Sequence, residues 1–372
     1  MSARFLTAVS GRAFNMRDRF GREIDYMRIS VIDSCNLNCY YCNPQDNNKN
    51  CQAINILSVK KVLCIVRAAT RLGITHFRLT GGEPLLHPQI DEMVSQIKKI
   101  PGVRSVSLTT NAVLLAQHAK QLKEAGIDSI NVSLDTIDAS EYEHITKKPL
   151  LHKVEQGIDA AIECGIRVKI NAVLTPQTDV VALTRYASKK GTDIRFIEMM
   201  PVGEGHTNGV EPYEKVIGAL LEVYGTPCHI DTENREEINS GYNNSDNGPA
   251  EYYSFHGLNI RVGLIQAIHG KFCDTCNRIR VTADGRLMPC LGSSVTMDLV
   301  PDSCEFTDDL EKDFVIVQAL KAAIKAKPGC HNFNDNAVTN TKTTETKTVE
   351  TKTTELKAAE VNAARNMSRI GG

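Results

Sequence analysis

The sequence lacks any large excess of charge of one sign. Its 372 residues contain 43 Lys and Arg against 44 Asp and Glu, so the formal net charge is −1. This balance excludes an overall basic surface for nucleic acid, although it leaves room for a local basic pocket. The composition, 42% hydrophobic and 23% charged, is that of an ordinary globular protein. The length is sufficient for two domains.

Long apolar runs are also missing. No window approaches the roughly 18–20 apolar residues that a membrane-spanning helix requires, and residues 1–20 lack the apolar run of a secretory signal. That segment carries Arg residues and no acid before Asp18, so a short organellar presequence is the alternative. We expect a reducing, cytoplasmic compartment, in which clustered cysteines bind metal more often than they form disulfides.

The twelve cysteines are the feature that departs from an average composition. Six of them form two triads, one spaced C-x3-C-x2-C and one spaced C-x2-C-x13-C. The first triad is Cys35, Cys39 and Cys42, and the second triad is Cys273, Cys276 and Cys290. The regular spacing marks these six residues, rather than the other six, as candidate metal ligands.

Between residues 27 and 200 short β-rich runs alternate with segments of helical period. The runs lie at 27–33, 76–80, 105–110, 129–135, 167–174 and 193–199. The intervening segment 58–73 predicts a helix that Ser58 caps and Gly73 ends. Strands that alternate with helices predict parallel βαβ units in an α/β fold. Six units favour an incomplete (β/α)6 barrel over a closed eightfold one, and a doubly wound open sheet is the competing arrangement. In either fold the functional groups are expected at the carboxyl ends of the strands.

The chain divides into five parts by composition. We expect an N-terminal extension at 1–19, the partial barrel with the first triad at 20–250, and a smaller C-terminal region that closes the barrel and carries the second triad at 251–333. Residues 334–355 are a Thr/Lys/Glu-rich tract with almost no apolar side chains, which predicts disorder. Residues 356–372 form a tail that ends in Gly371-Gly372.

The chemistry of the first triad follows from its compactness. Three thiolates on one short loop can bind three irons of a [4Fe-4S] cluster and leave the fourth iron open. The alternative is a structural zinc site, but such sites close at four ligands, and no fourth Cys or His lies close by. The spacing therefore favours iron–sulfur. The second triad is less specific, because its spacing alone fits a zinc ribbon that lacks one ligand equally well.

Three motifs together resemble the radical S-adenosylmethionine superfamily. They are the first triad with Tyr41 before its last cysteine, the glycine-rich turn RLTGGEP at 78–84 and the later strand motif NVSLD at 131–135. The second triad, the following NRIR at 277–280 and the terminal Gly371-Gly372 resemble, within this superfamily, the GTP 3′,8-cyclases of molybdenum cofactor biosynthesis. The resemblance runs from about residue 20 to 333, plus the last few residues.

This resemblance implies a lyase with two [4Fe-4S] clusters and S-adenosylmethionine as cofactor. The implied reaction is the first step of molybdopterin biosynthesis. A 5′-deoxyadenosyl radical takes the 3′ hydrogen of GTP, and the carbon radical attacks C8 of guanine to give 3′,8-cyclo-7,8-dihydro-GTP. The implied partners are GTP, an electron donor and the next enzyme of the pathway, with no nucleic acid or membrane. The resemblance also allows a homodimer.

The family match assigns site residues one by one. Both triads are implied to hold clusters, and Gly371 and Gly372 to act in catalysis. The implied S-adenosylmethionine contacts are Tyr41, Gly82, Ser133 and Met200. The implied GTP contacts are Arg28, Arg78, Thr109, Lys169, Arg195, Arg278, Ile279 and Arg280. Arg278 and Arg280 alternate on a β-like stretch, which predicts that they point the same way.

The chain departs from the family pattern at several positions. Asn43 stands where Met is usual, His87 where a basic residue is usual, and Lys147 where the family has Gly. Gln266-Ala267 replaces a Ser-Pro pair. No departure removes a cluster ligand, but together they leave open a divergent enzyme of the same superfamily that acts on a peptide or another substrate. A nonenzymatic zinc-binding or nucleic-acid-binding module is the third hypothesis, which the near-neutral charge and the first triad oppose.

Overall fold

A computed structural model of the chain describes residues 16–42, 54–202, 210–230, 248–293, 295–299, 310–331 and 333. Asn43, Gly371 and Gly372 lie outside the described residues, as do 1–15 of the expected N-terminal extension and all of 334–372. No helix within the described ranges is long and apolar enough to cross a membrane.

Six parallel strands form the centre of the sheet, at the positions that the sequence predicts. They are β1 (Tyr26–Ser30), β2 (His76–Thr80), β3 (Ser105–Thr110), β4 (Ser129–Ser133), β5 (Arg167–Val173) and β6 (Asp193–Ile197). Each pairs in parallel with the next one along the chain. This sequential order is that of a barrel.

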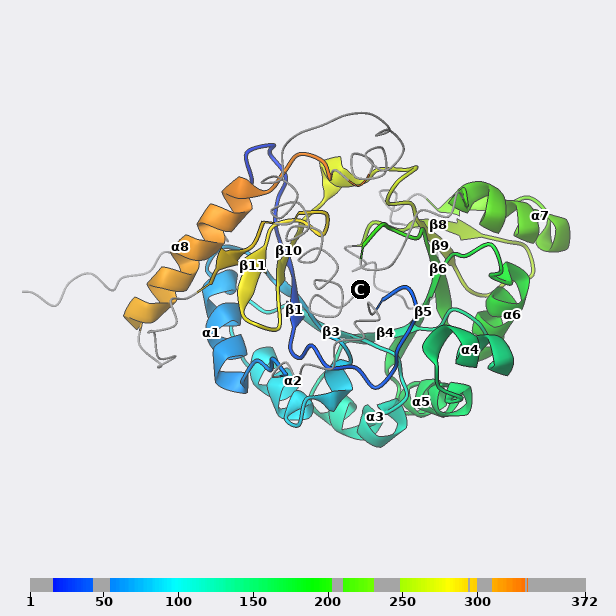
Figure 1. The fold of residues 1–372 in the computed structure, drawn as a ribbon, viewed down its shortest axis with the longest axis horizontal. Helices are drawn as coiled ribbons and strands as arrows, with labels where there is room; N and C mark the ends of the chain where they lie inside the picture. Colours follow the sequence, from blue (N-terminus) through cyan, green and yellow to red (C-terminus); the bar gives the residue numbers. More distant parts are fainter. Residues whose placement is uncertain are drawn as a thin grey trace, which may run out of the picture.

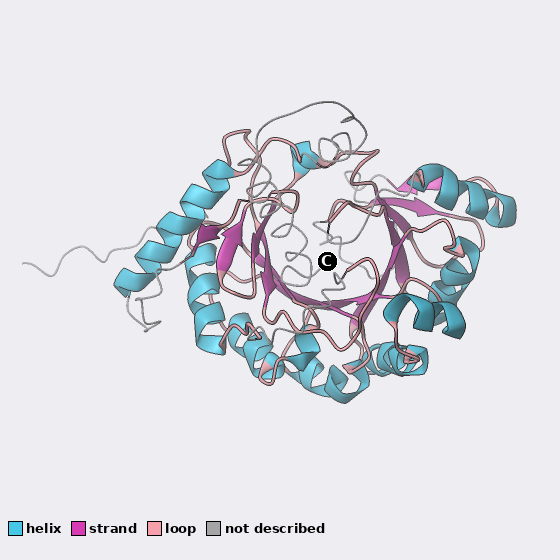
Figure 2. Cartoon of the chain, viewed as in Figure 1, coloured by secondary structure: helices cyan, strands magenta, loops and turns pink. Residues whose placement is uncertain are grey.

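The helices between these strands lie along the outer, convex face of the curved sheet (Figures 1 and 2). They are α1 (Val59–Thr70), α2 (Ile90–Lys98), α3 (Leu115–Glu124), α4 (Ala139–Thr146), α5 (Leu151–Glu163) and α6 (Val180–Lys190). A doubly wound sheet would carry helices on both faces, so that alternative is wrong for this chain. The fold is an incomplete α/β barrel.

Strands that follow β6 along the chain extend the sheet at both edges. β10 (Arg278–Val281) pairs in parallel with β1 and continues to β11 (Arg286–Met288) and β12 (Met297–Asp298). At the other edge, β9 (Val262–Ile265) pairs in parallel with β6 and continues to β8 (Glu251–Ser254) and β7 (Cys228–Ile230). In the described part of the chain β12 and β7 are the two edges, so the barrel stays open.

Shorter elements complete the fold. They are η1 (Pro84–Leu86), the π-helical turn η2 (Glu214–Gly218), α7 (Ala219–Tyr224), η3 (Cys273–Thr275) and α8 (Leu310–Ala326). α8 packs beside α1 on the outside of the molecule (Figure 1).

Helix α1 shows how local sequence sets these elements. The Ser58 side chain caps it by accepting a hydrogen bond from the Lys61 amide at 3.3 Å. The helix ends at Thr70, before the predicted stop, and Gly73 follows with a φ of +85° in the turn to β2. Its buried face includes Val62, Ile65 and Val66.

Candidate functional site

The two cysteine triads lie at opposite ends of the strands. Cys35 follows the carboxyl end of β1, whereas Cys276 precedes β10, whose first residue, Arg278, is in register with Tyr26 at the amino end of β1. The expectation that functional groups lie at the carboxyl ends holds for the first triad and is wrong for the second. The reason is that β10 runs parallel to β1. Cysteines that precede β10 therefore lie at the amino ends of the strands, opposite to the loop that follows β1.

The first-triad loop is held by backbone hydrogen bonds to the end of α4. The amide of Asn38 donates to the carbonyl of Thr146 at 3.0 Å, and the amide of Tyr40 donates to the carbonyl of Ile145 at 3.1 Å. Within the loop, the Cys42 amide donates to the Cys39 carbonyl. The thiols of the triad are therefore placed by the barrel itself.

The glycine-rich turn after β2 packs directly on the chain that leads into this loop. The Gly82 amide donates to the carbonyl of Ile32 at 2.8 Å, and the Glu83 amide donates to that of Ser34 at 2.9 Å. A Cβ atom on Gly81 would lie 2.3 Å from the Ile32 oxygen, and one on Gly82 would lie 2.2 Å from the Ser34 oxygen. Both positions therefore require glycine because two stretches of backbone meet there.

Glu83 ties the turn to the neighbouring strand. Its buried carboxylate accepts hydrogen bonds from the Leu85 amide, the Thr110 hydroxyl and the Asn111 amide at 2.7–2.9 Å. Burial raises the pKa of Glu83 to about 7 despite these donors. The Asn111 side chain in turn approaches the Cys35 thiol, with Nδ2 and Sγ 3.8 Å apart.

Tyr41 and the strand motif after β4 are joined by a short hydrogen bond. The Tyr41 hydroxyl donates to Asp135 Oδ2 at 2.6 Å, and the Val173 amide donates to Asp135 Oδ1 at 2.8 Å. Burial raises the pKa of Asp135, and burial together with that carboxylate raises the pKa of Tyr41. Ser133 is the last residue of β4, two positions before Asp135, and its side chain is exposed.

The environment of the first-triad thiols suits a cationic group. Burial, with the neighbouring Cys35 thiol, raises the pKa of Cys42 to about 11, and burial, with Asp135, raises the pKa of Cys39. Such thiols are stable as thiolates only when a metal offsets their charge. Among the described residues no three Cys, His, Asp or Glu side chains converge on a single metal ion. Three thiols on one short loop fit a polynuclear cluster, in which each binds its own iron.

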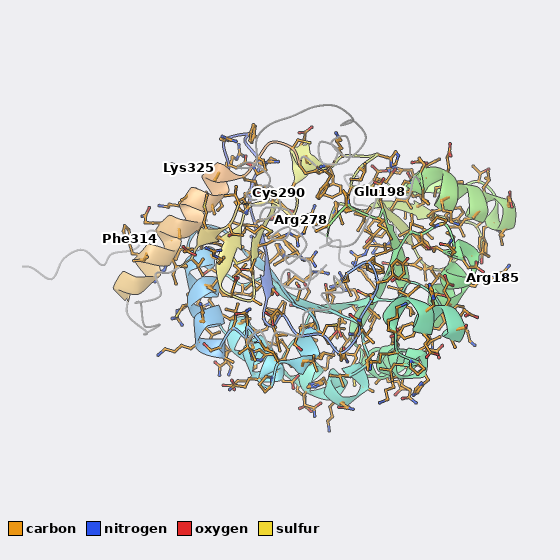
Figure 3. The ribbon with its side chains drawn as sticks, in the orientation of Figure 1. Arg185, Glu198, Arg278, Cys290, Phe314 and Lys325 are labelled. Carbon is orange, nitrogen blue, oxygen red and sulfur yellow. The ribbon has the colours of Figure 1, made fainter. Side chains whose placement is uncertain are left out.

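The second triad opens into a cavity of about 170 Å³ on the concave side of the sheet. Six cationic side chains line this cavity with the three cysteines: Arg28, Arg78, Arg195, Arg278, Arg280 and Lys327. Within the described chain no Asp or Glu lines it. Arg278 and Cys290 lie on this inner side, across from Glu198, whereas Arg185 lies out on the helix layer (Figure 3). The wall is suited to a ligand with several negative charges.

Strand register places three of the arginines in one row. Arg28 is paired with Arg280 on one side and with Arg78 on the other. Burial and the nearby Arg280 lower the pKa of Arg28, and burial and Arg278 lower the pKa of Arg280 to about 10. An anion among them would offset this mutual repulsion.

Two guanidinium groups on the cavity wall each have a nitrogen without a hydrogen-bond acceptor among the described residues. Nη1 of Arg280 and Nη2 of Arg195 are buried and have no partner among the residues that the structure describes. The Nε atom of Arg195 donates to Asn171 Oδ1 at 3.0 Å, which fixes the direction of its side chain. Buried donors of this kind are costly without an acceptor, so they mark where a ligand oxygen would bind.

Most of the nucleotide-binding residues that the sequence predicts lie on this wall. Arg28, Arg78, Thr109, Arg195, Arg278 and Arg280 line the cavity, as does Met200. Lys169 is buried on β5 in register with Asn131, which also lines it. Ile279 differs, because it lies between Arg278 and Arg280 on the opposite face of β10 and packs in the hydrophobic core.

The turn at 327–331 belongs to the site, although no motif in the sequence indicates it. Lys327 Nζ donates to the carbonyls of Arg278 and Pro289 at 2.8 and 3.0 Å. Arg22 Nη1 donates to the carbonyl of Cys273 at 2.6 Å, and its Nη2 donates to that of Pro328 at 2.6 Å. These bonds clamp the turn onto the second triad.

This turn brings one further thiol and one backbone amide to the triad. The thiol of Cys330 is hydrogen-bonded to that of Cys273, and the amide of His331 donates to the same Cys273 thiol. Neither contact has a sequence signal, because Cys330 lies 40 positions after Cys290 and outside both spacings.

Two of the departures from the family pattern have structural explanations. His87 is buried, and its Nε2 donates to the Leu57 carbonyl at 2.9 Å while Nδ1 accepts from the Gln89 amide at 3.1 Å, so it holds η1 in place. Lys147 adopts a left-handed φ of +60° as the C-cap of α4, which explains why glycine suits this position.

Comparisons with known proteins agree with this geometry. The profile of the Radical SAM superfamily matches residues 29–183, and that of Molybdenum Cofactor Synthesis C matches residues 192–333. The GTP 3′,8-cyclase of Clostridium perfringens strain SM101 is 36% identical over 322 residues, which cover 86% of this chain and 95% of the relative. The GTP 3′,8-cyclase of Clostridium acetobutylicum is 36% identical over 337 residues, which cover 88% and 98%.

Solved structures show a similar fold. The crystal structure of Streptococcus suis SuiB bound to S-adenosylmethionine has a TM-score of 0.54 and 17% sequence identity, and the match covers 82% of this chain and 68% of that one. SuiB bound to its precursor peptide SuiA has a TM-score of 0.55 at 16% identity.

Proposed function

The chain belongs to the GTP 3′,8-cyclase family of the radical S-adenosylmethionine superfamily, and we propose that it converts GTP to 3′,8-cyclo-7,8-dihydro-GTP. This reaction is the first step of molybdenum cofactor biosynthesis. Its cofactors are S-adenosylmethionine and two [4Fe-4S] clusters, one on each cysteine triad. The likeness to SuiB concerns the fold alone and does not favour a peptide substrate.

The single observation that carries the choice of substrate is the cationic cavity beside the second triad. Six Arg and Lys side chains face a space whose described lining contains no carboxylate. A triphosphate carries several negative charges and many acceptor oxygens, which matches the charge and the leftover donors of Arg195 and Arg280. A neutral peptide would not supply the negative charge that balances these cations.

The thiols of both triads fit the clusters that the family implies. The first triad lies on a loop that backbone hydrogen bonds hold at the carboxyl end of the barrel. The second triad is fixed by Arg22 and Lys327, which hold the adjacent carbonyls. When bound, the first cluster supplies one electron that cleaves S-adenosylmethionine to methionine and a 5′-deoxyadenosyl radical.

The residues of the chain then bind and orient the two substrates. Tyr41, Gly82, Ser133 and Met200 are the proposed contacts of S-adenosylmethionine. Of these, Tyr41 is held by Asp135, and Gly82 by the Ile32 carbonyl. Arg28, Arg78, Arg195 and Arg280 bind the triphosphate from the wall of the cavity. Because the two triads lie at opposite ends of the strands, a nucleotide in the cavity lies between them.

The reaction needs this arrangement. Hydrogen transfer from C3′ of GTP to the 5′-deoxyadenosyl radical gives 5′-deoxyadenosine and a carbon radical, which forms a bond to C8 of guanine. One further electron and one proton complete the dihydro product. Both electrons come from a donor protein or reductant, and the next enzyme of the pathway consumes the product.

Anaerobic incubation of the reconstituted full-length chain with GTP, S-adenosylmethionine and dithionite tests the proposal. We expect 5′-deoxyadenosine and the cyclic nucleotide in equal amounts. Replacing Cys35 with Ala should abolish both products, because the first cluster cannot assemble on two thiolates. Replacing Cys276 with Ala should abolish the cyclic product and leave some S-adenosylmethionine cleavage. Cleavage without a GTP-derived product in the wild-type chain would refute the proposed substrate.

A further inference from the structure

Cys330 is a thiol beside the second triad that the proposed reaction does not use. Its side chain is exposed, and its thiol is hydrogen-bonded to that of Cys273. The three cysteines of the second triad line the cavity, whereas Cys330 is not among the described residues of that lining. Cys330 is therefore open to reagents in solution and does not face the proposed nucleotide site.

The contact between the two thiols is set by the backbone around it. Arg22 is buried, and its Nη1 atom donates to the carbonyl of Cys273 at 2.6 Å and to that of Gly329 at 3.1 Å. Arg22 is itself held by Asp18, whose Oδ2 accepts from Nε at 2.7 Å. The amide of His331 donates to the Cys273 thiol. One guanidinium thus ties together the two distant segments that carry the thiols.

The C-x2-C spacing alone would pair Cys273 with Cys276 instead. In the structure, however, the Cys276 thiol is hydrogen-bonded to the side chain of Lys327. Lys327 Nζ also donates to the carbonyl of Arg278 at 2.8 Å, which fixes its position. Cys276 and Cys273 therefore have different neighbours, and the thiol that contacts Cys273 is that of Cys330.

Two thiols in contact, one of them exposed, meet the requirements for a disulfide formed by exchange. Exchange needs a sulfur that a disulfide in solution can reach. Closing the bond then needs side chains that face each other, so that rotation brings the sulfur atoms to bonding distance without backbone movement. Cys330 meets the first requirement by its exposure, and its contact with Cys273 meets the second.

We propose that oxidation of the cluster-free chain joins Cys273 and Cys330 in a disulfide, which withholds one ligand of the second triad from iron. The oxidant is a small disulfide such as glutathione disulfide. The Cys330 sulfur attacks it, its S–S bond breaks, and one glutathione leaves with the thiol proton. The Cys273 sulfur then attacks the Cys330 sulfur and releases the second glutathione. The two cysteines together lose two electrons and two protons, which the two glutathione thiols carry.

The consequence concerns the loading of the second cluster, and in this respect the inference rests on the proposed function. With Cys273 in a disulfide, only Cys276 and Cys290 remain as thiols of the second triad. Two thiolates do not hold a [4Fe-4S] cluster. Loading of the second triad therefore requires a reduced thiol pool, and a loaded cluster in turn protects Cys273 from exchange.

Disulfide mapping tests the pairing. The full-length chain is stripped of iron, reduced, and incubated anaerobically with glutathione disulfide. Free thiols are then alkylated, and the protein is digested without reduction for mass spectrometry. We expect a peptide in which Cys273 is linked to Cys330. A link between Cys273 and Cys276, or a Cys273 thiol that stays free, would overturn the inference.

Iron content tests the consequence, in the Cys35→Ala background, where the second triad holds the one expected cluster. Loading uses ferrous iron and stoichiometric sulfide without added thiol. Reduced protein should bind about four irons per chain and oxidised protein less than about one. Dithiothreitol should restore the iron. Adding Cys330→Ser should keep about four irons after the same oxidation. Cys228→Ser, at the exposed cysteine of β7, is the matched control and should not.

The remaining outcomes separate this inference from the proposed function. A non-reducing digest of the loaded sample shows whether the Cys273–Cys330 link is intact. Full iron content with the link intact would overturn the inference, because the disulfide would not then withhold a ligand. A reduced wild-type chain that loads only one cluster would refute the second cluster of the proposed function, whereas the mapped disulfide would stand.

Discussion

Gly82 and Ser34 meet at a distance that admits no side chain. A Cβ built on Gly82 would lie 2.2 Å from the carbonyl oxygen of Ser34, the residue that precedes the first cysteine of the first triad. The next residue, Glu83, donates its amide to the same oxygen at 2.9 Å. The glycine-rich turn is therefore a support for the cluster loop, in addition to any contact with a ligand.

Gly82→Ala should displace the loop that carries Cys35. The added Cβ would collide with the backbone of Ser34, which cannot move aside as a flexible side chain would. We expect reconstituted protein to lose about four irons per chain while the second triad stays loaded. Gly218→Ala is the control, since a Cβ there would meet no atom within 4 Å. Iron and sulfide analysis with the absorbance spectrum measures the effect, and full iron content in Gly82→Ala would contradict it.

Lys147 occupies a backbone conformation that suits glycine. Its φ of +60° is left-handed, and its amide caps α4 by donating to the Glu143 carbonyl at 2.8 Å. A residue with a side chain is less stable than glycine in this region by about 1 kcal/mol. Lys147→Gly should therefore raise the free energy of unfolding by up to about 1 kcal/mol, measured by urea denaturation. Lys148→Gly, outside the left-handed region, should not stabilise, and equal effects of the two changes would contradict the argument.

The sequence predicts the barrel well because its strands and helices depend on local patterns. All six predicted strands are present, and the predicted cap at Ser58 is confirmed. The first run extends past β1 because residues 31–33 leave the ladder to lead into the cysteine loop, where the Asp33 amide donates to the Asn55 carbonyl. Strand ends of this kind depend on partners from other parts of the chain.

The second half of the site was not predictable in the same way. Its position depends on the pairing of β10 with β1, which joins residues about 250 positions apart. The turn that carries Cys330 and His331 is attached through Arg22, which is 307 positions away from Gly329. No local periodicity encodes such contacts, so spacing identifies the cysteines of the second triad but not the side chains gathered around them.

The buried carboxyl of Glu83 makes stability depend on pH. Because its pKa is raised to about 7 in the folded chain, the folded state binds the proton more tightly than the unfolded state. Its contribution to stability is therefore fully present below about pH 4.5, the ordinary value, and is lost as the pH rises to about 7.

Glu83→Gln should remove this dependence, since an amide does not titrate in that range. The substitution lowers stability at every pH, because it places an amide among three donors. The deficit should nevertheless shrink by about 3 kcal/mol between pH 4.5 and 7.5. Urea denaturation at several pH values measures the difference, with Glu92→Gln, an exposed residue of α2, as the control. A deficit independent of pH would show that the carboxylate is not destabilised by burial.

Arg280 offers the most direct test of the phosphate site, because it is buried in the cavity wall and has a donor without a described partner. Arg280→Ala should weaken GTP binding by roughly ten- to a hundredfold, the usual effect of losing a charge-assisted hydrogen bond in a shielded site. The loss should be similar for ATP, since both nucleotides carry the same triphosphate. Arg185→Ala, on the outer face of α6 (Figure 3), is the matched control and should leave binding unchanged.

Raising the ionic strength moderately should not erase the difference in GTP affinity between the two variants, because a buried ion pair is screened much less than a surface pair. Equal affinities for Arg280→Ala and Arg185→Ala would show that the phosphates bind elsewhere in the chain.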